Sequence, residues 1–198
     1  MRQFLLVGHE APTTPTFALD DLAGAAGRLD VLCRCVSAGL FVSHDIREDT
    51  RVHLVLGDEF TVTVDGGSVK HLGPDERNVA ARIRDALGAR EDAIGHQPAE
   101  PTPGVELRRM GFSATLDRLA DDATVVQLHE SGAPVVDAEP PADPLFVLSD
   151  HADFASAESE RLAEVADERI RLGPRAVHAD HAVAVAHNYL DTDGYESY

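Results

Sequence analysis

The feature that most constrains the fold is an alternation of short apolar runs with longer segments of helical periodicity. Strands are expected at residues 2–7, 51–57, 123–128, 145–149 and 168–172, where Val, Leu and Ile dominate most of the runs. Continuous apolar runs of this length are typical of strands that are buried on both faces, as in parallel sheets. Because helical segments separate them, the sequence predicts an α/β fold in which helices cover both faces of a parallel sheet.

The helices are bounded by capping and turn residues. Asp20 or Asp21 is a suitable N-cap for a first helix that ends near Gly39, and Pro74 precedes a second helix that ends near Leu87. Alternating residues 60–72, with Asp65-Gly66-Gly67 in the middle, predict a small β-hairpin inserted near 58–72. The proline-rich residues 96–104 are expected to be a loop. Three further helices are expected at 113–121, at 155–166 and from about 175.

Length and composition indicate one domain. The chain has 198 residues, of which 43% are hydrophobic, so it can bury a substantial core. It contains no run of 18 apolar residues. The N-terminal stretch MRQFLLVGHE is too short, and reaches an acidic residue too soon, for a signal peptide. We therefore expect a single domain over residues 1–198, without a membrane segment and in the cytoplasm. Cys33 and Cys35, two positions apart on a helix, point to different faces and are expected to be reduced and structural.

The charge has two interpretations. The net charge is −18, and Lys70 is the sole lysine among 17 basic residues. Such a chain either avoids polyanions or comes from a high-salt cytoplasm, where surface carboxylates maintain solubility. We favour the second interpretation, because at roughly 1 M salt the Debye length is about 3 Å. Under those conditions a strongly acidic protein is still able to bind RNA.

Unusual loops follow three of the expected strands in the second half of the chain. They are Leu128-His129-Glu130-Ser131-Gly132, Ser149-Asp150-His151 and Gly173-Pro174-Arg175. Open α/β sheets bind ligands beyond the carboxyl ends of their strands, so these loops are candidate ligand loops. The usual glycine-rich nucleotide motifs, zinc-ligand motifs and the serine-hydrolase elbow are absent from the sequence, so we expect no metal site.

The same loops, taken with other segments, carry a family resemblance. The segments are GHEAPTTPTFALDDLAGAAGRLDVLCR (8–34), SHDIREDT (43–50), LGPDERN (72–78), GF (111–112), LHESG (128–132), LSDHADF (148–154) and LGPRAVHADHAVAVAHNYLD (172–191). Together and in this order they resemble the archaeal TrmY family, which belongs to the SPOUT class of methyltransferases. That family methylates N1 of a pseudouridine in the T-loop of tRNA, at position 54. The resemblance covers essentially the whole chain.

The resemblance implies a homodimer, a C-terminal trefoil knot within residues 122–191 and S-adenosylmethionine bound by the knotted loops. Backbone groups suit the edges of an adenine ring, and glycine permits close approach. The chain departs from the family pattern at two positions, with Ser149 in place of a glycine and Ala182 in place of a cysteine. The residues expected to bind the cofactor are Leu128, Ser149, Asp150, Leu172, Gly173, Pro174, Arg175, Ala176, Val177 and Ala182.

Methylation of N1 requires a group near the base that accepts the N1 proton. The candidate catalytic residues are Asp21, Arg28 and Asp30, although Asp21 is equally suited to a helix cap and Arg28 to an ion pair with Asp30. His9, Arg34 and Arg47 are the candidate RNA contacts.

The resulting hypothesis is a tRNA (pseudouridine-N1)-methyltransferase that uses S-adenosylmethionine. Two alternatives remain open at this point. One is a non-catalytic RNA- or nucleotide-binding module on the same fold. The other is a methyltransferase that acts on a pseudouridine of ribosomal RNA.

Overall fold

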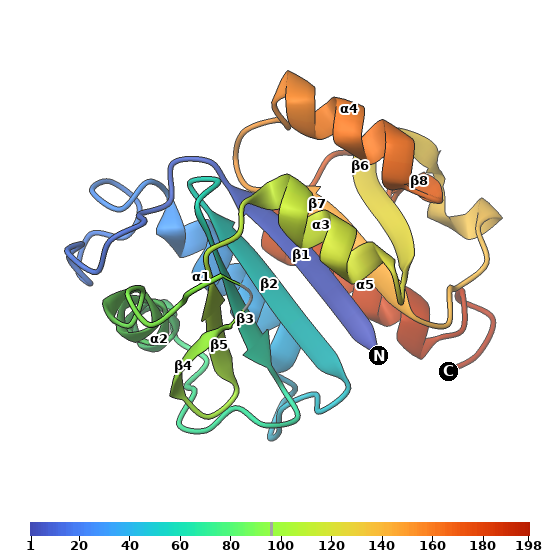
Figure 1. Ribbon diagram of the computed structural model, residues 1–198. Helices are drawn as coiled ribbons and strands as arrows, with labels where there is room; N and C mark the ends of the chain where they lie inside the picture. The colour runs from blue at the N-terminus through green and yellow to red at the C-terminus, as the bar shows by residue number, and fades with distance from the viewer. Residues whose placement is uncertain (96) are drawn as a thin grey trace.

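Eight strands form one sheet in the order β4-β5-β3-β2-β1-β7-β6-β8 (Figure 1). The structure is a computed structural model that describes residues 1–95 and 97–198. Five neighbouring strands are parallel: β2 (Thr50–Leu56), β1 (Arg2–Gly8), β7 (Pro144–Ser149), β6 (Thr124–Pro134) and β8 (Glu168–Arg171). The other three strands extend the sheet beyond β2, and each runs antiparallel to the strand it pairs with: β3 (Phe60–Asp65), β5 (Val105–Arg108) and β4 (Ala99–Thr102).

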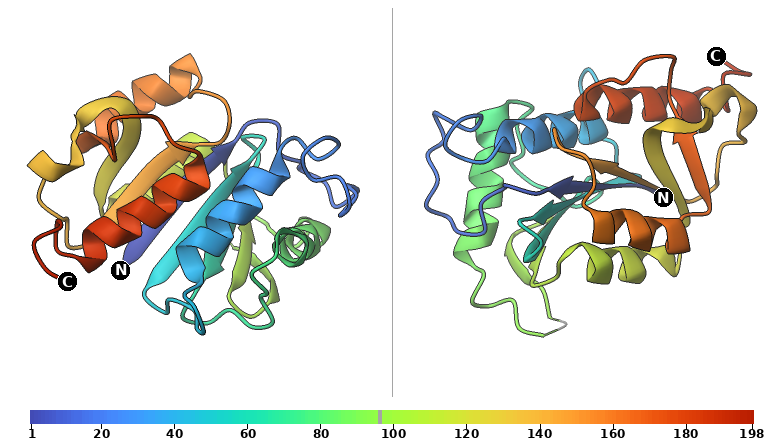
Figure 2. Two further views of the ribbon diagram at one scale, coloured as in Figure 1. Left: turned by 180° about the vertical axis from the view of Figure 1, so that it is seen from behind. Right: turned by 90° about the horizontal axis from the view of Figure 1, so that it is seen from above.

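Helices cover both faces of this sheet (Figure 2). One face packs against α1 (Leu29–Leu40), α2 (Glu76–Gly88) and α5 (Ala179–Asp191), and the other against α3 (Phe112–Ala120) and α4 (Ser156–Val165). The central strand β1 is buried on both sides, with Phe4 and Leu6 in the first layer and Leu5 and Val7 in the second. A 3₁₀ turn, η1 (Val135–Asp137), lies in the β6–β7 connection. The α/β class with helices on both faces is therefore confirmed, and the sheet is mostly rather than wholly parallel.

The first helix begins later than expected. Gly27 and Arg28 both have left-handed backbone angles, with φ of 54° and 60°, so an α-helix cannot pass through them. Leu22 and Ala26 are nevertheless buried in the core, so the apolar spacing read as a helix belongs to a loop that packs on α1. The carboxylate of Asp21 accepts a hydrogen bond from the Gly24 amide at 2.9 Å and closes a turn in that loop.

The expected hairpin at residues 60–72 is wrong in its turn and its second strand. Residues 57–59 form the actual turn, in which Gly57 and Asp58 both have φ of 54°, and β3 pairs with the preceding strand β2. Beyond β3, the Gly66 amide donates to the Thr50 carbonyl, and the chain then leaves the sheet.

The proline-rich segment is also partly misassigned, because residues 99–102 form β4 rather than a loop. Pro101 is compatible with β4 because β4 is an edge strand, where a missing N–H donor costs little. Gly104, with φ of 75°, turns the chain from β4 into β5.

The two cysteines are free and buried in α1. Burial raises the pKa of both thiols, so they remain protonated at neutral pH. This agrees with the expected structural role. Among the described residues, no helix is long and apolar enough to cross a membrane.

Candidate functional site

A cavity of about 380 Å³ lies between the middle of β6 and the carboxyl ends of β7 and β8. Two of the three candidate ligand loops follow strands as expected, but residues 128–132 do not form a loop, because β6 continues through them to Pro134. The loop after β8 is longer than expected, because α5 begins at Ala179 and not near residue 175. Residues 172–178 are therefore free to form one wall, and apolar side chains contribute to the other walls. The cavity is lined by Leu128, His129, Glu130, Leu148, Ser149, Asp150, His151, Ala152, Asp153, Phe154, Arg171, Leu172, Gly173, Arg175, Ala176, Val177, His178, Ala179 and Ala182.

The structure brings together nearly all the residues expected to bind the cofactor. Pro174 is the exception, since it belongs to the same turn but is not among the lining residues. Several lining residues were not singled out from sequence, among them Phe154 and His178. Phe154 belongs to the quoted segment LSDHADF, which was the available signal. His178 was not singled out because the last helix was expected to begin near residue 175, which placed His178 inside the helix and not in the loop before it.

A bulge in β6 opens the cavity. The pairing of β6 with β8 shifts register between Leu128 and Ala133, so the intervening residues leave the regular ladder. Gly132 allows this close approach, because a Cβ atom there would lie 2.5 Å from the backbone of Ile170. At Gly173 the reason is different. An added Cβ would meet only the Arg175 carbonyl oxygen at 4.0 Å, so glycine leaves this wall open.

Asp150 fixes the central loop of the site. Its side chain is 1% exposed, and its two carboxylate oxygens accept hydrogen bonds from the His9 amide at 3.1 Å and the Ala152 amide at 2.9 Å. The His9 ring lies between two carboxylates, with Nδ1 3.3 Å from Asp150 and Nε2 2.8 Å from Glu158 on α4. The loop after β1, the loop after β7 and α4 are thereby joined in one network. Sequence reasoning selected His9 and Asp150 but missed Glu158.

Burial disfavours the charged form of His9, but the hydrogen bonds and charges of Glu158 and Asp150 outweigh it and raise the pKa above the ordinary 6.5. The charged imidazole therefore stabilises the folded state. That stabilisation is complete below pH 6.5 and is lost as the pH rises through the folded-state pKa.

We expect Glu158→Gln to lower the pKa of His9, because it removes one of the two negative charges and keeps an oxygen that can accept a hydrogen bond. NMR titration of the His9 ring measures this directly, and urea unfolding between pH 5.5 and 8.5 measures the linked stability. Glu160→Gln, at an exposed position of the same helix, is the control. An unchanged His9 titration in Glu158→Gln contradicts the assigned network.

A second charged cluster lies at the start of α1. Asp30 is buried and accepts hydrogen bonds from Arg28 at 3.0 Å and Arg34 at 2.9 Å. Burial alone would raise the pKa of Asp30, but the two arginines lower it, so this carboxylate stays ionised. Arg34 also lies 3.7 Å from Asp180, which follows the cavity residue Ala179 in α5. The cluster is thus connected to the cavity wall, whereas Asp21 is engaged in its own turn.

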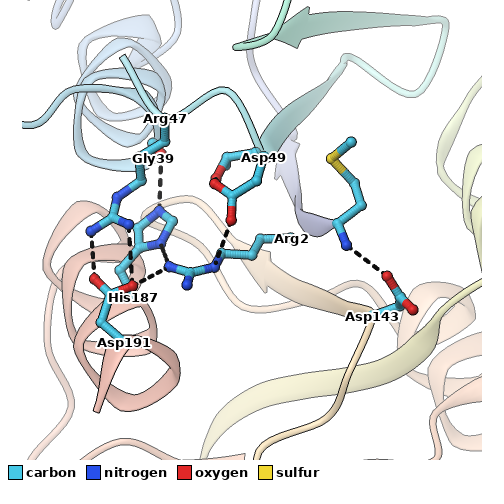
Figure 3. A network of polar contacts seen from close by, with 9 residues as sticks. Arg2, Gly39, Arg47, Asp49, Asp143, His187 and Asp191 are labelled. Carbon is cyan, nitrogen blue, oxygen red and sulfur yellow. Dashed lines mark hydrogen bonds and ion pairs between the residues drawn. The ribbon is translucent and has the colours of Figure 1, made fainter. Parts of the chain in front are cut away.

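Arg47 lies away from the cavity. Its guanidinium pairs with Asp191 at 2.6 Å, near the end of α5 and the amino ends of the parallel strands (Figure 3). Arg2 shares Asp191 and also contacts Asp49. His187 of the same network donates from Nε2 to the Gly39 carbonyl oxygen, and burial followed by the charge of Arg47 lowers its pKa to about 4. The network ties α5 to α1 and β1, and the structure does not place Arg47 beside the other predicted site residues.

Among the described residues, no group of three or more His, Cys, Asp or Glu side chains is arranged to hold a metal ion. What the cavity offers is a ligand site of small-molecule size, bordered by apolar side chains and by carboxylates fixed in place.

Comparison with known proteins identifies the family to which the chain belongs. Residues 1–195 match the family model described as "Putative SAM-dependent RNA methyltransferase". The chain is 66% identical over its full length to a tRNA (pseudouridine(54)-N(1))-methyltransferase of Haloferax volcanii and covers all of that protein. It is 39% identical to the protein of the same name from Methanocella arvoryzae, with 93% of this chain and 96% of that protein aligned.

A solved structure shares the fold at low sequence identity. It is Archaeoglobus fulgidus Nep1 bound to S-adenosylhomocysteine, with a TM-score of 0.61, 12% identity and 96% of each chain covered. The match in fold supports a SPOUT-like arrangement. From the full-length match to the family model and the high identity to its archaeal relatives, the chain belongs to the S-adenosylmethionine-dependent RNA methyltransferases, in the TrmY family.

Proposed function

We propose that this protein is a tRNA (pseudouridine-N1)-methyltransferase that transfers the methyl group of S-adenosylmethionine to N1 of pseudouridine 54. The observation that carries the proposal is the cavity, because the middle of β6, the loops after β7 and β8 and the start of α5 converge there. These segments contain nearly all the residues expected to bind the cofactor. The names of the full-length relatives support the same reaction and substrate.

The residues of the cavity fit such a cofactor. Its volume of about 380 Å³ falls within the roughly 300–1,000 Å³ range of small-molecule sites. Leu128, Leu148 and Leu172 provide apolar wall for an adenine ring, and the open position at Gly173 leaves its backbone accessible. The two departures from the family pattern, Ser149 and Ala182, both line the cavity. The Ser149 hydroxyl donates to the Ala152 carbonyl within its own loop, so it needs no partner in the ligand.

When bound, the cofactor supplies an electrophilic methyl group on its sulfonium. The chain must then hold pseudouridine in line with that methyl and remove the N1 proton. We assign the positioning to Arg28 and Arg34, whose guanidinium groups Asp30 fixes, and of which Arg34 also lies beside Asp180 of α5. Asp30 itself is a poor proton acceptor because both arginines bind it. Asp21 is exposed and remains the candidate acceptor, and His9 remains a candidate contact on the substrate side.

We further propose that the enzyme is a cytoplasmic homodimer, that residues 122–191 contain a trefoil knot and that the enzyme works at high salt. The knot is supported by the contact of α5 with the β6–β7 connection, where the Tyr189 hydroxyl donates to the Ala138 carbonyl at 2.9 Å. The high-salt setting is supported by the charge of −18.

The proposed reaction is tested by methyl transfer from labelled S-adenosylmethionine, in high salt, to two T-loop RNAs. One carries pseudouridine at position 54 and the other carries uridine. Label in the pseudouridine RNA alone, recovered as N1-methylpseudouridine after digestion, is the expected result. Cofactor binding without transfer to either RNA contradicts the proposal and favours a ribosomal substrate or a non-catalytic module.

A further inference from the structure

Most arginines of this acidic chain are paired with a carboxylate, and those without such a partner are not spread evenly over the fold. Ten of the sixteen arginines form ion pairs with carboxylates. The candidate RNA contacts Arg34 and Arg47 are among these ten. Within the described part of the chain, six have no carboxylate partner within 4 Å. Three of these six are clustered on one strand and the turn that follows it: Arg169, Arg171 and Arg175.

These three residues lie along an edge of the sheet. β8 is the last strand in the sheet order, beside β6, so no strand of residues 1–95 or 97–198 pairs with its other side. Arg169, Arg171 and Arg175 are all exposed. Arg171 and Arg175 line the cofactor cavity, whereas Arg169 lines a groove of about 350 Å³ against α4. The three arginines, here called the β8 arginine edge, therefore lead along the surface to the cavity.

Asp167 and Glu168 line the same groove as Arg169, but neither forms an ion pair with an arginine of the edge within the described part of the chain. Side chains alternate along a strand, so Glu168 and Ile170 share the face opposite Arg169 and Arg171. Ile170 belongs to the core beneath α5. The carboxylate of Asp167 accepts a hydrogen bond from the Val125 amide at 2.8 Å.

We propose that the β8 arginine edge binds the phosphate backbone of the RNA substrate and directs the target nucleotide toward the cavity. This inference rests on the proposed function and adds a binding surface to it. Arg169 and Arg171 project from the same face two residues apart, about 6.6–6.8 Å along the strand. Successive phosphates of a nucleic-acid strand are able to match that spacing. Since Arg171 also donates to the Gly132 carbonyl at 3.2 Å, its position is fixed by the β6 bulge that opens the cavity.

The test measures the affinity of the full-length protein for tRNA containing pseudouridine 54 over a range of salt concentrations. The variants are Arg169→Gln and Arg171→Gln. Arg161→Gln is the matched control, since Arg161 lies on the adjacent helix α4 but pairs with Asp117 and Glu164. We expect each variant to weaken tRNA binding about tenfold, and to reduce the slope of log affinity against log salt by about 0.7–0.9. Arg169→Gln should leave S-adenosylmethionine affinity unchanged.

The outcomes separate this proposal from the proposed function. If wild type methylates the tRNA while both variants bind it as Arg161→Gln does, the β8 arginine edge is wrong and the reaction stands. If wild type binds no tRNA, the proposed function fails and the edge fails with it. Charges on an edge strand also keep sheets from pairing edge to edge. Aggregation or an altered oligomeric state in the variants, with unchanged tRNA affinity of the soluble fraction, would assign the arginines to that purpose and overturn the proposal.

Discussion

Gly173→Val is expected to lower the affinity for S-adenosylmethionine at least 100-fold while the fold remains intact. A Cβ at this position would be in ordinary contact with the Arg175 carbonyl oxygen at 4.0 Å, so the protein itself accommodates the substitution. The added methyl groups instead occupy space in a cavity of about 380 Å³, where a cofactor of similar size would have to sit. A loss of 100-fold corresponds to about 2.7 kcal/mol, which one steric clash with the bound cofactor can supply.

Calorimetric titration with S-adenosylmethionine measures the effect, and the thermal unfolding midpoint shows whether the fold is retained. Gly88→Val is the control, because nothing lies within 4 Å of a Cβ at Gly88, the last residue of α2. Equal cofactor affinity in Gly173→Val and Gly88→Val would remove the turn after β8 from the cofactor site.

Asp150→Ala is expected to destabilise the protein by about 1–3 kcal/mol and to weaken cofactor binding as well. The substitution leaves the amides of His9 and Ala152 without their acceptor. The His9 amide is partly buried, and losing its partner costs about 1–3 kcal/mol, whereas the exposed Ala152 amide can bind water instead. It also removes the carboxylate that holds the His9 ring and so releases the loop after β7 from the loop after β1.

The free energy of unfolding in urea provides the measurement. Asp153→Ala is the matched control, since Asp153 also lines the cavity but is exposed and should change stability by no more than about 0.5 kcal/mol. If the two variants are equally stable, Asp150 does not have the structural role assigned to it.

The parts of this fold that were predicted from sequence depend on local patterns. The continuous apolar run of residues 2–7 indicated a doubly buried strand, and β1 lies between the parallel strands β2 and β7 with side chains buried on both faces of the sheet. The errors arose where tertiary packing overrides a local pattern. Leu22 and Ala26 have helical spacing but belong to a loop, because Gly27 and Arg28 adopt left-handed angles that no spacing reveals. Likewise β4 was not predicted, because it contains Pro101, a residue that normally argues against a strand, and only its pairing with β5 at the edge of the sheet makes it one.

The candidate site was predictable to a similar degree. The sequence indicated which segments line the site, and we expected them to lie together because parallel strands have their carboxyl ends on the same side of the sheet. Glu158 was not predicted, because it acts through a contact with His9, 149 positions away in the chain. Arg47 was chosen by residue type within a family segment. In the structure Arg47 pairs with Asp191 near the amino ends of the parallel strands, away from the cavity, and its contact with RNA stays a prediction.

A crystal structure of this protein with S-adenosylhomocysteine, the product of methyl transfer, tests the central claim most directly. The account predicts that the adenosine lies against Leu128 and the backbone of residues 172–177, with the loop at Asp150 closing the site. Density for the ligand in any other place, with the cavity between β6, β7 and β8 empty, would contradict it.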